Sequence, residues 1–95
     1  MDNHTKLRVN PDVVLREEFD DWAILFDPNT GKAYGINPVS VIIWRHLDGT
    51  RTVDDLLAEL HNHCDNVPDS ANSDLMAFLQ QLVEKGFAGA NHGNG

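Results

Sequence analysis

Polar and apolar side chains alternate through the first third of the chain, with the period of two that is typical of half-buried strands. The two apolar faces that follow this period are Val13, Leu15 and Phe19, and then Trp22, Ile24 and Phe26. After the second face, residues 27–31 read Asp-Pro-Asn-Thr-Gly, which supplies the proline and glycine that a tight turn needs. We therefore expect a three-stranded antiparallel β-meander whose third strand is Lys32–Ile36.

The pattern becomes helical at Asn37. Its side chain can accept a hydrogen bond from a first-turn amide, and Pro38 lacks the amide that the first helical residue would leave unpaired. An apolar stripe then continues at helical spacing through Val39, Ile42, Ile43 and Leu47. We expect this helix to end near Asp48, with Gly49 in the left-handed conformation that closes many helices.

Thr52 and Asp55 approximate a capping box, which predicts the start of a second helix. This helix is expected to run to about Cys64. A polar linker over residues 65–73 separates it from a third helix, which begins between residues 69 and 73. The apolar stripe of the third helix is Leu75, Phe78, Leu79, Leu82 and Val83. Gly86 is expected to close this helix, with Phe87 packing back onto Leu82.

The segment after the third helix, residues 88–95, consists of Gly, Asn and Ala with one His. Such a composition buries too little to offset its ordering entropy, so we expect a disordered C-terminal tail. The predicted class is α+β, with three strands followed by three α-helices in one domain over residues 1–87.

Charge and composition narrow the possible partners. The 95 residues carry a net charge of −8, which disfavours binding to nucleic acid or to an anionic membrane surface. The longest apolar stretch covers residues 39–44, far below the roughly 20 residues that span a bilayer. A single cysteine, Cys64, and an N-terminus without a signal-peptide pattern predict a cytoplasmic protein.

The junction of the third strand with the first two helices resembles the PqqD family. The short motifs of this chain that match the family pattern are Ile36-Asn37, Ile43-Trp44, Leu47-Asp48-Gly49 and Thr52-Val53. In the third helix and at its end, the matching residues are Asp74-Leu75, Phe78-Leu79, Leu82 and Gly86-Phe87. The resemblance covers about residues 8–88. Departures from the family pattern are Ile36 in place of Leu, Pro38 in place of a polar residue, and the ending Phe87-Ala88.

The resemblance implies a winged-helix-like, PqqD-like peptide-recognition domain without an active site or cofactor. Such a module binds the leader of a ribosomally made precursor peptide and presents it to a modifying enzyme, often a radical-SAM protein. Two other functions stay open, namely a winged-helix DNA-binding or transcriptional adaptor and a regulatory accessory subunit of an enzyme.

The expected peptide site combines an edge strand with one flank of the third helix. An edge strand presents unpaired amides and carbonyls to an incoming strand, and residues at spacings of four and three share one side of a helix. The predicted peptide-binding residues are Lys32, Ala33, Tyr34, Gly35, Ile36, Asp74, Phe78 and Gln81. In the competing interpretation, Gly35 only relieves crowding beside the first helix, and Phe78 belongs to the core.

Other candidate sites have simpler interpretations. His61, His63 and Cys64 supply only three ligands and no second pair completes a closed set, so no metal site is expected. Trp22 and Trp44 are expected in the core rather than in an aromatic platform. The acidic residues at 17–18 and 20–21 point to opposite faces of a hairpin and are expected to be solvated. No motif for nucleophilic, phosphate or metalloprotease chemistry is present, so no enzyme activity is predicted.

Overall fold

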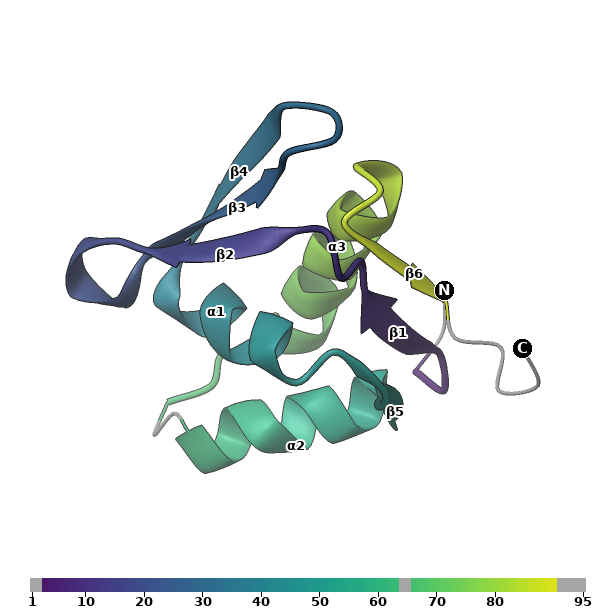
Figure 1. The fold of residues 1–95 in the computed structure, drawn as a ribbon. Coiled ribbons are helices and arrows are strands. Elements are labelled where there is room, and N and C mark those ends of the chain that lie inside the picture. Colours follow the sequence, from purple (N-terminus) through teal and green to yellow (C-terminus); the bar gives the residue numbers. More distant parts are fainter. Residues whose placement is uncertain (1–2, 64–65, 91–95) are drawn as a thin grey trace.

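The computed structural model describes residues 3–63 and 66–90. It confirms the α+β class and the predicted order of a meander followed by three helices (Figure 1). The meander has the order β2-β3-β4, formed by β2 (Val14–Glu17), β3 (Ala23–Asp27) and β4 (Lys32–Ile36). The helices are α1 (Pro38–Arg45), α2 (Val53–His63) and α3 (Ala71–Glu84), and a short 3-10 turn, η1 (Phe19–Asp21), precedes β3.

The inward face of the meander is set by the register between β3 and β4. Ala23 pairs with Ile36 and Leu25 pairs with Tyr34, and paired residues point to the same side of a sheet. Ala23 and Leu25 are buried in the core, and so is Asp27, whose carboxylate accepts a 2.9 Å hydrogen bond from the Asn29 amide in the turn. The face of β3 that points into the core therefore has smaller and less apolar side chains than its outer face.

The prediction that Trp22, Ile24 and Phe26 form the buried face was wrong. Trp22 is 51% exposed and Phe26 is 41% exposed. Phe19, predicted on the buried face of the first strand, lies in η1 and is 87% exposed. Both faces of this hairpin carry apolar side chains, so alternation alone could not show which face the helices cover. Trp44 is buried, as predicted, but Trp22 is not in the core.

A second antiparallel sheet, of order β5-β1-β6, was not predicted. Its strands are β1 (Lys6–Val9), β5 (Asp48–Thr52) and β6 (Ala88–Ala90), which come from the beginning, middle and end of the chain (Figure 1). Strand β1, with the sequence Lys-Leu-Arg-Val, alternates polar and apolar residues but has only four of them. Strands β5 and β6 show no such alternation, so the sequence gives little local signal for this sheet.

The expected disordered tail is corrected over residues 88–90. Val9 pairs with Ala88 and Leu7 with Ala90 in the β1–β6 ladder, and the Asn10 amide donates a 2.8 Å hydrogen bond to the Phe87 carbonyl. Phe87 is fully buried and Ala88 nearly so, which holds the following residues against β1. The remainder of the predicted tail, residues 91–95, lies outside the described residues.

Helix α1 begins as predicted but ends earlier. Asn37 caps it by accepting a 2.8 Å hydrogen bond from the Ser40 amide, with Pro38 in the first turn. The helix ends at Arg45 with His46 as its C-cap, and the chain then enters β5, where Gly49 has φ +85°. The left-handed glycine was predicted correctly, but it lies inside a strand rather than at the helix end.

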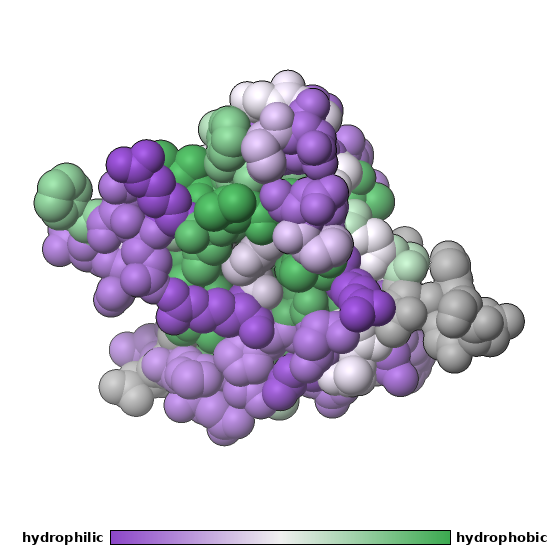
Figure 2. Space-filling model, in the orientation of Figure 1, coloured by the Kyte–Doolittle hydropathy of each residue, from purple (hydrophilic) through white to green (hydrophobic). Residues whose placement is uncertain are grey.

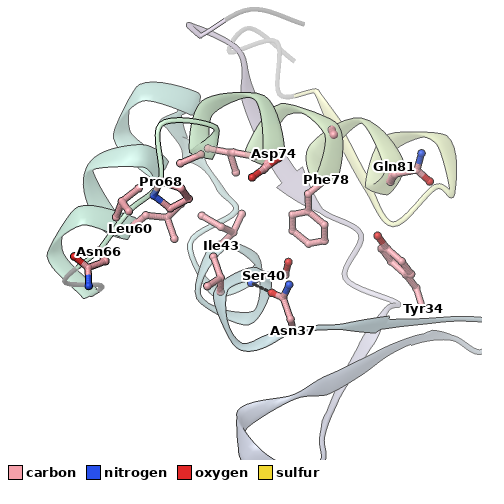
Figure 3. A pocket seen from close by; sticks show the side chains of 15 residues that line it. Tyr34, Asn37, Ser40, Ile43, Leu60, Asn66, Pro68, Asp74, Phe78 and Gln81 are labelled. Carbon is pink, nitrogen blue, oxygen red and sulfur yellow. Dashed lines mark hydrogen bonds between the residues drawn. The ribbon is translucent and has the colours of Figure 1, made fainter.

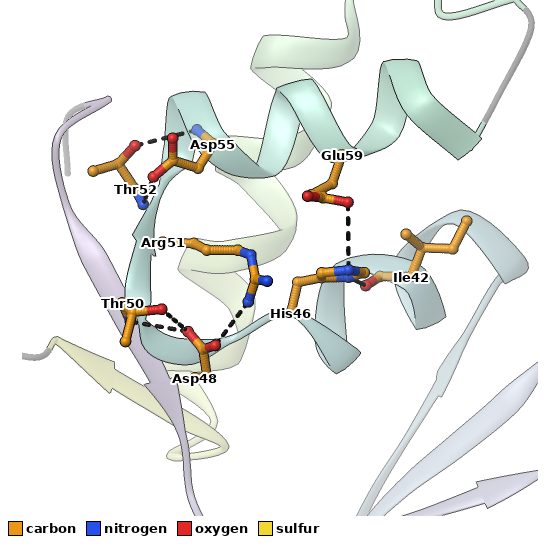
Figure 4. Close-up of polar contacts among 8 residues, drawn as sticks. All are labelled: Ile42, His46, Asp48, Thr50, Arg51, Thr52, Asp55 and Glu59. Atoms are coloured by element: carbon orange, nitrogen blue, oxygen red, sulfur yellow. Dashed lines mark hydrogen bonds and ion pairs between the residues drawn. The ribbon is translucent and has the colours of Figure 1, made fainter.

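The predicted capping box at the start of α2 and the predicted closure of α3 are both confirmed. Thr52 Oγ1 accepts from the Asp55 amide at 3.1 Å, and Asp55 Oδ2 accepts from the Thr52 amide at 2.9 Å (Figure 4). At the end of α3, Gly86 has φ +76° and the Phe87 amide donates a 2.8 Å bond to the Leu82 carbonyl. This is a Schellman closure. Helix α2 ends at His63, and Cys64 lies outside the described residues.

Apolar side chains from both sheets and all three helices form one core. Its fully buried members include Leu25, Ile43, Leu56, Leu79, Leu82 and Phe87. On the face of the molecule drawn in Figure 2, apolar surface nevertheless gathers near the meander and is bordered by hydrophilic surface. In residues 3–63 and 66–90, no helix has both the length and the apolar content to cross a bilayer.

Removal of residues 88–95 tests whether β6 contributes to the stability of the fold. This truncation should lower the free energy of unfolding by at least about 1 kcal/mol, because it removes the β1–β6 hydrogen bonds and the burial of Ala88. Urea unfolding followed by circular dichroism measures the loss. Removal of residues 91–95 alone is the matched control, since it leaves β6 in place. Equal stability of the two truncated chains would contradict the structural role of β6.

The contacts of the Asp48 carboxylate should make the folding stability of the chain depend on pH in the acid range. Thr50 donates to it from its hydroxyl at 2.6 Å and from its amide at 2.9 Å, and Arg51 lies at 2.7 Å (Figure 4). These contacts lower the pKa of Asp48 from 3.8 to about 2, and the Thr52 amide also lowers the pKa of Asp55. Because the folded pKa is the lower one, the stabilisation is present above pH 3.8 and is lost as pH falls toward 2.

We expect Asp48→Asn to be less stable than the parent chain near neutral pH and to lose less stability between about pH 4 and pH 2. Urea midpoints measured across this range give the comparison. Parallel pH profiles for the two chains would show that Asp48 does not carry the effect.

Candidate functional site

A groove of about 480 Å³ opens between α3 and the N-terminal half of α1, with β4 at one end (Figure 3). Five parts of the chain contribute to it. Its lining residues are Tyr34, Asn37, Val39, Ser40, Ile43, Leu60, Asn66, Val67, Pro68, Ala71, Asp74, Leu75, Ala77, Phe78 and Gln81. Segments far apart in the sequence therefore form one concave surface.

The lining is mainly apolar with a few polar groups at its margins. Among the described lining residues, Asp74 is the only charged one, and Asn37, Ser40, Asn66 and Gln81 supply neutral polar groups. This composition suits a ligand that buries apolar side chains and is fixed in orientation by a few hydrogen bonds.

One stripe of α3 forms the longest wall of the groove. Asp74, Phe78 and Gln81 follow each other at spacings of four and three, and all point toward the groove (Figure 3). The neighbouring stripe, Leu75, Leu79 and Leu82, is buried in the core and so fixes the rotation of the helix. Asp74 is held in place by the Ser70 hydroxyl, which donates to its carboxylate at 3.0 Å.

Aromatic rings join α3 to β4 at one end of the groove. The centroids of Tyr34 and Phe78 are 6.3 Å apart with the rings tilted by 33°, within the range of favourable aromatic pairs. Lys85 Nζ lies 5.1 Å from the centroid of the Tyr34 ring, in cation–π geometry. Phe78 is partly buried, so it both packs on the core and presents its ring to the groove.

Strand β4 is an edge strand within the described residues: it pairs with β3 on one side and has no strand partner on the other. Ala33 and Gly35 are exposed on the face of the sheet away from the core. A Cβ atom added to Gly35 would meet no atom within 4 Å, so this glycine does not relieve crowding beside α1. An incoming strand would meet little side-chain bulk here.

The structure brings together half of the predicted site residues in the groove. Tyr34, Asp74, Phe78 and Gln81 line it. Lys32, Ala33 and Gly35 lie along exposed β4, while Ile36 is buried in the core and has no surface to offer a ligand. The contributions of α1, α2 and residues 66–68 were missed, although Val39, Ser40 and Ile43 already stand at helical spacing on one side of α1.

The acidic residues of the first hairpin and the histidines of α2 lie outside the groove lining. Glu17 forms an ion pair with Arg45, and Glu18 lies 3.7 Å from Arg16, so these carboxylates are exposed members of separate pairs. Within residues 3–63 and 66–90, the possible metal ligands that lie near His63 are His46 and Glu59, and His61 is not among them; Cys64 lies outside the described residues.

Comparisons with known proteins are consistent with the fold and identify the family. A solved structure, TbiB1 in complex with the TbiA(beta) leader peptide, has a TM-score of 0.69 and 22% identity, covering 85% of this chain and 93% of that one. At this identity the likeness shows a shared fold. No curated protein matches the chain. The family described as coenzyme PQQ synthesis protein D (PqqD) matches residues 23–88. Because this match covers most of the chain, the protein belongs to the PqqD family.

Proposed function

We propose that this chain binds the leader segment of a ribosomally made precursor peptide, without modifying it. The observation that carries the proposal is the position of the groove directly beside the open edge of β4. Membership of the PqqD family supports it, as does the fold shared with TbiB1, which was solved with a leader peptide.

The peptide adds to β4 as an antiparallel strand. Alternate amides and carbonyls of β4 point away from β3, and an extended peptide can pair with them whatever its sequence. Side chains on one face of the added strand then enter the groove between β4 and α3, because successive side chains alternate across a strand. Backbone pairing supplies affinity and the groove supplies selectivity.

The groove favours a leader with apolar residues at alternate positions and one basic residue. Phe78, Ile43 and Leu60 offer apolar contacts, and Asp74 is the acidic group at the groove wall. No described lining residue is Lys, Arg or His, so a cationic side chain near Asp74 would meet no like charge from the lining.

The partner that receives the peptide is a modifying enzyme, with a radical-SAM protein as the first candidate and other peptide-modifying enzymes as alternatives. Support comes from a second open surface: Val14, Trp22 and Phe26 are 53%, 51% and 41% exposed on the outer face of the meander. They do not line the groove, so an enzyme can contact them while a peptide occupies it.

Binding fits the residues better than catalysis or DNA recognition. Among the described lining residues there is no Cys or His, the side chains that most often act as nucleophile or base. Residues 38–95 carry three basic and eight acidic side chains, which opposes the phosphate contacts that a DNA-binding adaptor requires. The winged-helix likeness and the cytoplasmic location stay predictions.

Phe78→Ala should weaken binding of a leader peptide that the parent chain binds by about 10- to 100-fold, because it removes the aromatic anchor of the groove. Isothermal titration of the folded variant measures the change. Val83→Ala is the matched control, since Val83 is a 40% exposed apolar residue of α3 outside the groove. An equal loss of peptide affinity in both variants, or no loss in Phe78→Ala, would show that the groove does not bind the peptide.

Peptide addition at β4 should protect alternate amides of Lys32–Ile36 from hydrogen exchange, because only the outward-facing amides gain new partners. Exchange measured by NMR with and without the peptide gives the pattern. Ala33→Pro should reduce binding by distorting the edge strand, whereas His61→Ala on α2 should leave it unchanged. Peptide binding that leaves all β4 amides unprotected would contradict strand addition while preserving the groove.

A further inference from the structure

Three side chains of types that can bind metal ions meet at the junction of α1 and α2, and none of them lines the groove. Glu59 and His63 stand four residues apart on α2, and His46, the C-cap of α1, faces them. One possible ligand atom from each residue lies within 4.8 Å of the other two. All three side chains are partly exposed, at 22% for His46, 28% for Glu59 and 49% for His63, so an ion from solution can reach them.

The distances suit ligands around a common ion better than direct hydrogen bonds. Glu59 Oε2 lies 3.5 Å from His46 Nε2 and 3.7 Å from His63 Nε2. A charge-assisted hydrogen bond would bring these atoms to about 2.7–2.9 Å. Two ligands bound to a tetrahedral zinc ion at about 2.0–2.1 Å are separated by about 3.3 Å. Two of the three separations are therefore close to the spacing of ligands around such an ion, and the third ligand pair lies within 4.8 Å.

A second observation places a ring hydrogen of His46 on Nδ1. Its Nδ1 lies 2.7 Å from the carbonyl oxygen of Ile42, and a carbonyl can only accept, so Nδ1 carries the hydrogen (Figure 4). In the neutral ring, Nε2 then has a free lone pair, and Glu59 Oε2 lies 3.5 Å from this nitrogen (Figure 4). Metal-binding histidines commonly have this arrangement, in which the second ring nitrogen donates to a carbonyl and orients the first.

We propose that His46 Nε2, Glu59 Oε2 and His63 Nε2 form a binding site for Zn²⁺ or a similar first-row transition ion. Two imidazoles and one carboxylate are a ligand set of zinc proteins, whereas Mg²⁺ and Ca²⁺ prefer oxygen ligands alone. The fourth position is left to water or to another ligand. The site is separate from the proposed peptide function and does not depend on it.

The ion would tie the end of α1 to α2. Ile43, one turn before His46, and Leu60, next to Glu59, line the groove from these same two helices. Metal binding should therefore raise the melting temperature of the full chain, since it stabilises the folded state in which His46 faces α2.

Titration of the full chain with ZnCl₂ tests the site. We expect one ion per chain, and Glu59→Gln or His46→Gln should lower the affinity at least about tenfold. NMR spectra of the imidazole ring nitrogens give a second readout. Zn²⁺ should change the Nε2 chemical shifts of His46 and His63 and leave those of the His61 ring unchanged. Circular dichroism of each variant checks that the fold is retained.

Two control variants distinguish the proposed site from Zn²⁺ binding by other side chains nearby in the sequence. His61→Gln removes a nearby imidazole outside the cluster and should retain the parent affinity. Cys64→Ser removes the thiol that follows His63 in the sequence and should also retain one bound ion. The proposal is overturned if the chain takes up no Zn²⁺, or if Cys64→Ser abolishes binding while Glu59→Gln and His46→Gln leave it intact.

Discussion

The burial of one stripe of α3 determines the arrangement of the rest of the site. Leu75, Leu79 and Leu82 are at most 4% exposed, and burying side chains of this size contributes about 1.5–3 kcal/mol each. A helix anchored on three such residues cannot rotate without exposing them. The adjacent stripe, with Asp74 and Phe78, is therefore held at the groove. The Schellman closure at Gly86 then turns the chain so that Phe87 enters the same core and β6 reaches β1.

The meander contributes the other half of the site through its register. Because Tyr34 pairs with Leu25 and Ile36 with Ala23, the inward side chains of β4 meet α3 and the core. Ala33 and Gly35 are consequently turned outward, where they leave the strand edge unobstructed. The same register exposes Trp22 and Phe26 on the far side of the sheet, so one pairing pattern defines two separate surfaces of the domain.

The α1–α2 junction shows how residues remote in sequence become neighbours. The early end of α1 places His46 at a C-cap instead of within a helix, and its ring then bonds back to the Ile42 carbonyl. Helix α2 is fixed in turn by the reciprocal bonds of Thr52 and Asp55 and by the burial of Leu56 and Leu60. The cluster of His46, Glu59 and His63 follows from these two anchored helices.

Features that depend on local chemistry could be predicted from the sequence. The Asn37 cap, the capping box at Thr52 and the closure at Gly86 were all predictable, because each is a hydrogen-bonding pattern among residues close in the chain. The same holds for the α+β order and for the flank of Asp74, Phe78 and Gln81, which follows from helical geometry.

Which surfaces meet depends on long-range packing, which the structure shows and the sequence patterns do not. The β5-β1-β6 sheet joins segments from the beginning, middle and end of the chain, and its strands of three to five residues are too short for a local pattern to reveal the pairing. The buried face of β3 was undetermined because apolar residues stand on both of its sides, and the covering helices select one. The groove residues on α1 and α2, and the meeting of His46 with His63, likewise depend on long-range packing, which local sequence patterns do not encode.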